Sequence, residues 1–134
     1  MIVSLAHVAV RVSALEPAIE FYCQKIGLTE AFRLTGPEGQ VWIVYLKVGN
    51  GTFIELFPGG EPGNRAPGDV LGPNHFCIQV DDVEATVKQW RSRGIEPTSG
   101  PSIGKDGAAQ AWFADPDGNR FEIHQYLPGA LQLG

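Results

Sequence analysis

The sequence HVAVRV at residues 7–12 returns as HFCIQV at residues 75–80, and this pair of stretches decides the fold. The offset between the two is 68 residues (75 − 7). Farther along, IEL at residues 54–56 matches FEI at residues 121–123 with an offset of 67 (121 − 54). One residue deleted after the helix of the second copy accounts for the change. The chain is therefore a duplication of one structural unit.

Each copy has the pattern of a strand, a helix and three further strands. Residues 5–12 alternate between apolar and polar side chains, which is typical of a half-buried strand. The apolar spacing after it predicts a helix over residues 15–26, with Ser13 as N-cap and Gly27 as its C-terminal stop. The remaining segments are expected as strands 29–35, 40–48 and 52–57, then strand 74–80, helix 82–93, and strands 97–99, 107–114 and 119–126. We expect the tail from Pro128 onward to be loosely held.

These elements predict an α+β fold formed by tandem βαβββ repeats. Two such repeats would form a curved, concave mixed sheet of about eight strands, with the helices on the outer face. We expect a single domain over residues 1–134, with repeat one at 4–58, a linker loop at 59–73 and repeat two at 74–127.

Composition narrows the classes of function. The net charge of −5 argues against a nucleic-acid binder, which would carry basic clusters. No apolar run is long enough to span a membrane, and the N-terminus lacks the pattern of a signal peptide. Cys23 and Cys77 are expected to be reduced thiols. These features predict a cytoplasmic protein without nucleic-acid or membrane partners.

Four residues recur at equivalent places in the two copies: His7 with His75, and Glu55 with Glu122. Strand alternation sets all four side chains on the face opposite to the apolar, helix-covered one. A carboxylate between aromatic neighbours is costly to bury unless a cation balances it. We interpret the four residues as ligands of one divalent metal.

Two neutral imidazoles and two carboxylates give a neutral site around a divalent ion. This ligand set suits Ni, Co, Zn, Fe or Mn, and the sequence does not choose among them. Four protein ligands in an octahedron leave two positions for water or substrate, as catalysis requires. His124 shares the face of Glu122 but has no repeat partner, because its equivalent (124 − 67) is Phe57. We interpret His124 as a pocket-lining, substrate-binding residue, with an ordinary polar role as the alternative.

With its repeat and its candidate ligands, the chain resembles the vicinal oxygen chelate superfamily. This superfamily includes glyoxalase I, epimerases, extradiol dioxygenases and bleomycin-resistance proteins. The resemblance runs from Leu5 to about Tyr126. It rests on the segments HVAVRV (7–12), AIEFY (18–22), FIELF (53–57), HFCIQVDDV (75–83) and FADPDGNRFEI (113–123).

The resemblance implies a function through the ligand set. His7, Glu55, His75 and Glu122 match the His/Glu/His/Glu pattern of bacterial glyoxalase I. Methylmalonyl-CoA epimerase usually has Gln where Glu55 stands. Extradiol dioxygenases use two His and one Glu, and bleomycin-resistance proteins typically lack the ligands. Glu55 therefore favours a glyoxalase I type of site.

Only one of the three glutathione contacts expected from the family is present in this sequence. Arg11 corresponds to an arginine that contacts the glutathione carboxylate in glyoxalase I. The asparagine and the second arginine expected from the family are Gly59 and Leu71 here. The resemblance therefore implies lactoylglutathione lyase-like chemistry without securing glutathione as the substrate.

We expect a metal-dependent lyase or isomerase that acts on a small oxygenated substrate through an enediolate-like intermediate. Glu122, or Glu55 by the pseudo-symmetry, would be the general base. Substrate contacts are expected from Arg11, Phe53, Phe57, Trp112 and His124. The alternatives are an Fe(II)-dependent dioxygenase and a non-enzymatic drug-binding protein, in which Trp42 would join an aromatic pocket. A homodimer is expected, and the metal site could form within one chain or across two chains.

Overall fold

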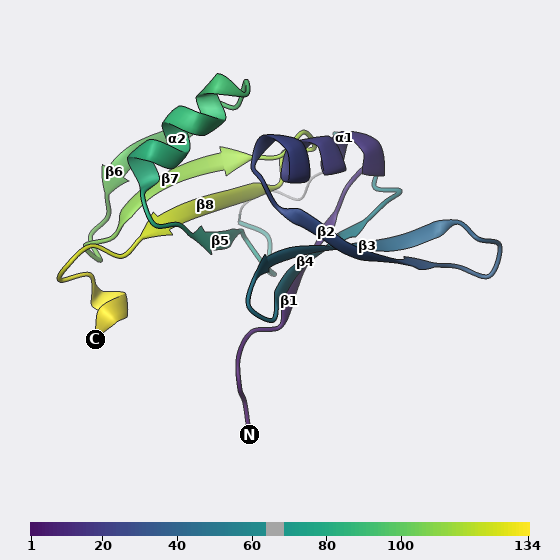
Figure 1. Cartoon of the computed structure of the whole chain (residues 1–134), viewed down its shortest axis with the longest axis horizontal. Helices are drawn as coiled ribbons and strands as arrows, with labels where there is room; N and C mark the ends of the chain where they lie inside the picture. Colours follow the sequence, from purple (N-terminus) through teal and green to yellow (C-terminus); the bar gives the residue numbers. More distant parts are fainter. Residues whose placement is uncertain (64–68) are drawn as a thin grey trace. The chain divides into compact units, whose positions relative to one another are not determined.

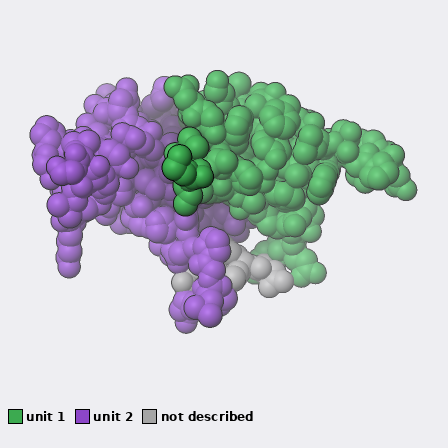
Figure 2. All heavy atoms as spheres, turned by 90° about the horizontal axis from the view of Figure 1, so that it is seen from below, with its two compact units in different colours: residues 1–65 green, residues 66–134 purple. Residues whose placement is uncertain are grey.

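The computed structural model describes residues 1–63 and 69–134, so the middle of the predicted linker 59–73 lies outside the described residues. The chain divides into two compact units, residues 1–65 and 66–134, which Figure 2 colours green and purple. Each unit contains one copy of the duplicated sequence. Both units are built in the same order.

The helices and strands follow the predicted order in both units (Figure 1). The first unit contains β1 (His7–Arg11), α1 (Leu15–Ile19), η1 (Glu20–Lys25), β2 (Thr29–Thr35), β3 (Val41–Gly49) and β4 (Thr52–Phe57). The second unit contains β5 (Phe76–Gln79), α2 (Val83–Ser92), β6 (Ser99–Ile103), β7 (Ala109–Ala114), β8 (Arg120–Gln125) and η2 (Leu131–Leu133). The predicted α+β fold of tandem βαβββ repeats is confirmed.

The eight strands form two four-stranded mixed sheets, one in each unit. Their orders are β1-β4-β3-β2 and β5-β8-β7-β6, which are the same arrangement twice. The parallel neighbours are β1 with β4 in the first sheet and β5 with β8 in the second. All other neighbouring strands are antiparallel. The registers also correspond, since Ala9 lies opposite Glu55 and Cys77 lies opposite Glu122. The duplication therefore extends from the sequence to the pairing of individual residues.

The first helix begins at Leu15 as predicted, but its cap lies one residue later than predicted. The N-cap is Ala14 in an extended conformation, and not Ser13. The carbonyl of Ser13 accepts a hydrogen bond from the amide of Gly59, so this residue still belongs to the extended segment beside β4. After one α-helical turn the segment continues as the π-helix η1, in which the amide of Ile26 bonds the carbonyl of Phe21. No helix in residues 1–63 or 69–134 is long and apolar enough to cross a membrane.

The second helix is capped as its sequence requires. Asp82 is the N-cap of α2, and its side chain accepts a hydrogen bond of 2.9 Å from the amide of Ala85. This contact satisfies one of the amides that the first turn leaves without a helical partner.

Apolar side chains fill the space between the helices and one face of each sheet. In the first unit α1 packs on β4, and in the second α2 packs against β6, β7 and β8 (Figure 1). The largest fully buried side chains are Tyr22, Leu46, Ile54 and Leu56 in the first unit and Phe113, Phe121 and Ile123 in the second. The opposite face of each sheet is left for other side chains, and the candidate ligands lie there.

The C-terminal part of the second unit departs from the expectations. Strand β6 is Ser99–Ile103 and not residues 97–99, because this segment pairs with β7 through an irregular register. The tail is not loosely held. Ala130 is buried, and the amide of Leu131 bonds the carbonyl of Asp106 at 2.8 Å. The side chain of Gln132 also donates to the carboxylate of Asp106.

Candidate functional site

His7 and Glu55 form a close pair on the first sheet. The two residues lie on the parallel neighbours β1 and β4, and His7 Nε2 is 3.3 Å from Glu55 Oε2. Glu55 is only 6% exposed, whereas 46% of the His7 side chain is exposed. Ile54 and Leu56 on either side of Glu55 belong to the core, so the alternation of β4 turns the carboxylate to the other face.

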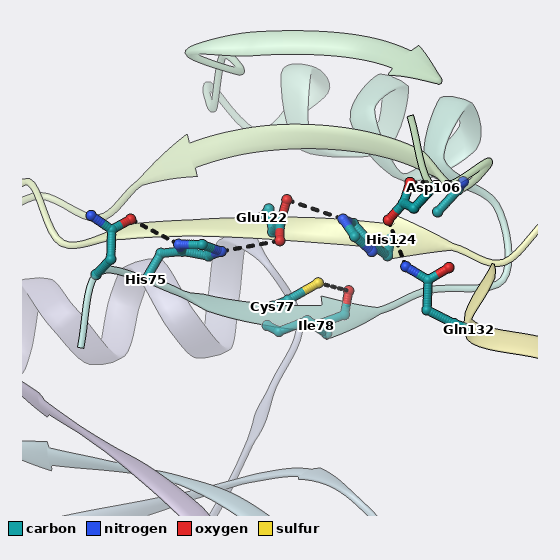
Figure 3. A network of polar contacts seen from close by, with 9 residues as sticks. His75, Cys77, Ile78, Asp106, Glu122, His124 and Gln132 are labelled. Carbon is teal, nitrogen blue, oxygen red and sulfur yellow. Dashed lines mark hydrogen bonds and ion pairs between the residues drawn. The ribbon is translucent and has the colours of Figure 1, made fainter. Parts of the chain in front are cut away.

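His75 and Glu122 form the equivalent pair on the second sheet (Figure 3). His75 immediately precedes β5, and its Nε2 atom is 3.1 Å from Oε1 of Glu122 in β8. Glu122 is 7% exposed. The other ring nitrogen of His75, Nδ1, lies 2.9 Å from Oδ1 of Asn74. The same two residue types thus meet in the same way in both units.

A neutral His75 ring has one N–H and cannot donate to both of its contacts, whereas a protonated ring donates to both. Both partner atoms are oxygens, on the amide of Asn74 and on the carboxylate of Glu122. An amide oxygen only accepts, so the contact with Asn74 needs the proton on Nδ1. A neutral imidazole then offers a lone pair at Nε2, which faces a second acceptor. A cation shared by Nε2 and the carboxylate oxygen would satisfy both atoms.

The distances within the pairs suit shared coordination of a metal ion. Two ligand atoms, each about 2.1 Å from one ion, lie about 3.0 to 3.4 Å apart in octahedral or tetrahedral geometry. The observed separations are 3.3 Å for His7 and Glu55 and 3.1 Å for His75 and Glu122. Imidazole nitrogen and carboxylate oxygen are donors for first-row divalent metals. The donor set of each pair therefore fits such an ion.

Aromatic rings border the His7–Glu55 pair. The ring of Tyr45 lies edge-on to His7, and Tyr45 pairs with Glu55 across β3 and β4. A hydrogen bond to Glu55 raises the pKa of the Tyr45 hydroxyl, because the phenol proton stabilises the carboxylate. Phe32 stacks on Tyr45 at 4.3 Å between ring centroids, and Phe53 stands edge-on to both rings. We call Phe32, Tyr45 and Phe53 the aromatic cluster of the first unit.

One aromatic ring and one cation border the second pair. The ring of Trp112 lies 4.5 Å from the ring of His75, and Trp112 pairs with Glu122 across β7 and β8. The guanidinium of Arg120 lies 5.0 Å from the Trp112 ring centroid. Trp112 and Tyr45 are equivalent by the repeat (112 − 45 = 67). Each carboxylate thus has an aromatic residue beside it on the neighbouring antiparallel strand.

Other predicted substrate contacts have partners within their own unit. Arg11 donates from Nη1 to the carbonyl of Pro58 at 2.9 Å, and its guanidinium lies 5.3 Å from the ring centroid of Phe57. Leu71, which stands where the family has a second arginine, is fully exposed. Trp42 lies near the start of β3 and is 56% exposed.

His124 joins the second pair. Its Nε2 atom is 3.0 Å from Oε2 of Glu122, so the carboxylate stands between two imidazoles, those of His75 and His124 (Figure 3). Cys77 lies opposite Glu122 in the parallel register of β5 and β8. Burial, followed by the nearby charge of Glu122, raises the pKa of the Cys77 thiol to about 12.

Sequence reasoning missed Tyr45, Phe32, Asn74 and Cys77 as neighbours of the candidate ligands. The repeat could have identified Tyr45, because Tyr45 is equivalent to Trp112, which was predicted as a substrate contact. Cys77 lies two positions from His75 on a common face, so alternation carried that signal as well. The contacts of Phe32 and Asn74 depend on lateral register and side-chain rotamers, for which the sequence has no local signal.

The chain has relatives that share one fold and differ in activity. The sequence pattern of the Glyoxalase/Bleomycin resistance protein/Dioxygenase superfamily matches residues 4–123. A probable lactoylglutathione lyase from Vibrio cholerae is 30% identical over 125 residues, which cover 90% of this chain and 89% of the relative. A 2-epi-5-epi-valiolone epimerase from Actinomyces sp. is 29% identical in an alignment that is 150 residues long with its gaps. This alignment covers 96% of this chain and 82% of the relative.

A solved structure with a different role is also similar. TnmS3, an antibiotic-binding protein from Streptomyces sp. CB03234, aligns with a TM-score of 0.73 at 26% identity. The alignment covers 94% of this chain and 98% of that chain. The similar proteins therefore include lyases, an epimerase and a binding protein, and the choice among these functions depends on the site residues.

Proposed function

Because the chain belongs to the glyoxalase/bleomycin resistance protein/dioxygenase superfamily, we propose that it is a metal-dependent lyase or isomerase of glyoxalase I type. One observation carries the proposal. A buried carboxylate contacts an imidazole at the same place in both repeats, with His7 beside Glu55 and His75 beside Glu122. A binding protein without a metal has no need for two such pairs. The substrate would be a small molecule with two neighbouring oxygen atoms.

His7, Glu55, His75 and Glu122 would hold one divalent ion, and either one chain or two chains of a homodimer would supply them. When bound, the ion supplies a Lewis acid that stabilises negative charge developing on a substrate oxygen. Two imidazoles and two carboxylates balance its charge, so the loaded site is neutral. The burial of Glu55 and Glu122 supports this role, since a carboxylate that has lost most of its water is costly to keep without a cation.

Glu122 is proposed as the general base, with Glu55 as its counterpart in the other repeat. A carboxylate oxygen of Glu122 would take the proton from the carbon beside the substrate carbonyl and return it to the neighbouring position. Exclusion of water around a carboxylate that is 7% exposed strengthens its interaction with that proton. Phe53 and Trp112 would contact the apolar part of the substrate, with further contacts from Arg11, Phe57 and His124.

The site favours this chemistry over two related activities. An Fe(II)-dependent dioxygenase needs open positions for both substrate and dioxygen, and Glu55 would occupy one of them. The epimerases with Gln at this position lack the second carboxylate. Glutathione as co-substrate is a separate question, because Gly59 and Leu71 lack the side chains expected to bind it. Methylglyoxal is therefore to be tested with and without glutathione.

A second candidate function is non-enzymatic binding of an aromatic small molecule. The exposed Phe32, which is stacked on Tyr45 in the aromatic cluster, favours it, and so does the likeness to the antibiotic-binding TnmS3. Metal content distinguishes the two functions, because such a binding protein is expected to purify without stoichiometric metal.

The test is elemental analysis of the purified protein, followed by an assay with methylglyoxal in the presence of Ni²⁺ or Zn²⁺. We expect turnover that depends on the metal and is lost in Glu122→Gln, while the circular dichroism spectrum is unchanged. Glu38→Gln is the matched control, since Glu38 is exposed. Full activity of Glu122→Gln would refute the role of Glu122. A protein that binds no divalent metal would refute the proposed chemistry.

A further inference from the structure

Three donor atoms of different chemistry come together beside the His75–Glu122 pair. The sulfur of Cys77, a carboxylate oxygen of Glu122 and a ring nitrogen of His124 all lie within 4.8 Å of one another. Cys77 comes from β5, and the other two residues come from β8. Figure 3 shows Cys77 next to Glu122, with His124 following Glu122 along β8. All three residues belong to the second unit.

The ring nitrogen of His124 is buried and has no hydrogen-bond partner among the described residues. The residue as a whole is 9% exposed. Its Nε2 atom is 3.0 Å from Oε2 of Glu122, but the contact lacks the geometry of a hydrogen bond. Buried ring nitrogens are normally paired, so a lone nitrogen aimed at a carboxylate indicates a partner of another kind. A metal ion is such a partner for both atoms.

The duplication shows that the fold does not require these donors. The position equivalent to Cys77 is Ala9 (77 − 68), and the position equivalent to His124 is Phe57 (124 − 67). Both pairs of positions occupy the same places in their sheets, since Ala9 faces Glu55 as Cys77 faces Glu122. The first repeat thus forms the same sheet without a thiol or a second imidazole. At these two positions only the second repeat has side chains that could bind a metal.

We propose that Cys77, Glu122 and His124 form a second ligand set, which lets the second unit hold a thiophilic divalent cation such as Zn²⁺ or Cd²⁺. Tetrahedral ligand atoms at about 2.1 Å for nitrogen and oxygen and about 2.3 Å for sulfur lie about 3.4 to 3.6 Å apart. The three atoms now lie within 4.8 Å of one another, so binding would require them to approach by about 1 Å. On binding, the thiol of Cys77 releases its proton to solvent as the sulfur–metal bond forms.

This ligand set shares Glu122 with the four-ligand site, but it does not rest on the proposed function. A soft thiolate ligand favours Cd²⁺, imidazole with carboxylate suits Ni²⁺ and Mn²⁺, and both ligand sets suit Zn²⁺. One chain would therefore select between two ligand sets according to the ion that it meets. His7 contributes only to the four-ligand site, and Cys77 only to the second set.

The test is titration of the metal-free full chain with Cd²⁺ alone, followed by ultraviolet absorption of the thiolate-to-metal charge-transfer band. We expect a band that saturates at one ion per chain and is absent from both Cys77→Ser and Cys77→Ala. His124→Ala is expected to lower Cd²⁺ affinity by more than about tenfold. Circular dichroism establishes that each variant is folded.

Two controls separate this proposal from the proposed function. Cys23→Ser removes the other free cysteine, which lies on η1 in the first unit, and is expected to keep the band. His7→Ala disrupts the four-ligand site and is also expected to keep it. Absence of the band in the wild type, its persistence in Cys77→Ser, or its loss in Cys23→Ser or His7→Ala would overturn the proposal.

Discussion

Replacement of Glu122 by glutamine is the sharpest perturbation of the candidate site. The substitution keeps the shape of a side chain that is 7% exposed and removes its charge. Glu122 contacts the imidazoles of both His75 and His124, so it belongs to every metal site that we propose. Glu122→Gln is therefore expected to remove the stabilisation that a bound metal confers, while the metal-free protein stays folded.

The size of the effect follows from linkage. A ligand at one hundred times its dissociation constant stabilises the folded state by about 2.7 kcal/mol. The unfolding entropy of a chain of 134 residues is about 0.28 kcal/mol/K near 60 °C. Saturating Ni²⁺ is thus expected to raise the Tm of the wild type by about 10 °C. The metal-free variant should melt within about 4 °C of the metal-free wild type, which corresponds to about 1 kcal/mol.

Differential scanning calorimetry with and without Ni²⁺ measures both quantities. Glu38→Gln, which changes an exposed carboxylate in the same way, is expected to show the full shift of the wild type. A shift of about 10 °C in Glu122→Gln would refute the reasoning, because the stabilising ion would then bind without this carboxylate.

Three further predictions concern the fold around the site. Asp82→Ala removes the N-cap bond to Ala85 and is expected to cost about 1 kcal/mol, measured by urea denaturation against the wild type. Phe121→Ala removes a fully buried ring from the core of the second unit and is expected to cost about 3 to 5 kcal/mol in the same experiment; a loss below 1 kcal/mol would contradict the packing described. The hydrogen bond from Gln132 lowers the pKa of Asp106 from its ordinary value of 3.8, so the bond favours folding above that pH and is lost as pH falls through the lowered pKa. The protection factors of the tail amides, which correct for the intrinsic pH dependence of exchange, should therefore be constant above pH 3.8 and fall below it, and Asp106→Asn should remove that acid-dependent step.

Much of the fold could be predicted because the signal is repeated. The alternation in residues 7–12 and 75–80 placed both histidines on the face opposite the core, and the offsets of 68 and 67 paired the two halves. The start of the first helix agrees with the prediction but its N-cap does not, since the cap depends on backbone contacts outside the helix. Ser13 has the right side chain for a cap, but its carbonyl bonds the amide of Gly59, so the helix begins after Ala14.

The immediate neighbours of the ligands were harder to predict than the ligands themselves. Tyr45 stands beside Glu55 because of the register of the β3–β4 hairpin, and Cys77 stands beside Glu122 because of the register between β5 and β8, which are distant in sequence. Periodicity along one strand tells which face a residue occupies, but it carries no information on which residue lies across from it. The tail illustrates the same limit, because its attachment depends on Asp106, which lies in a loop of the second repeat.

The central claim is that the two His–Glu pairs belong to one metal site. Calorimetric titration of the metal-free protein with Ni²⁺ tests it most directly, with His7→Ala and His75→Ala beside the wild type. We predict one ion per chain in the wild type and an affinity more than about 100-fold lower in both variants, although each variant alters only one pair. Wild-type affinity in either variant, or two ions per wild-type chain with one lost in each variant, would contradict a single shared site.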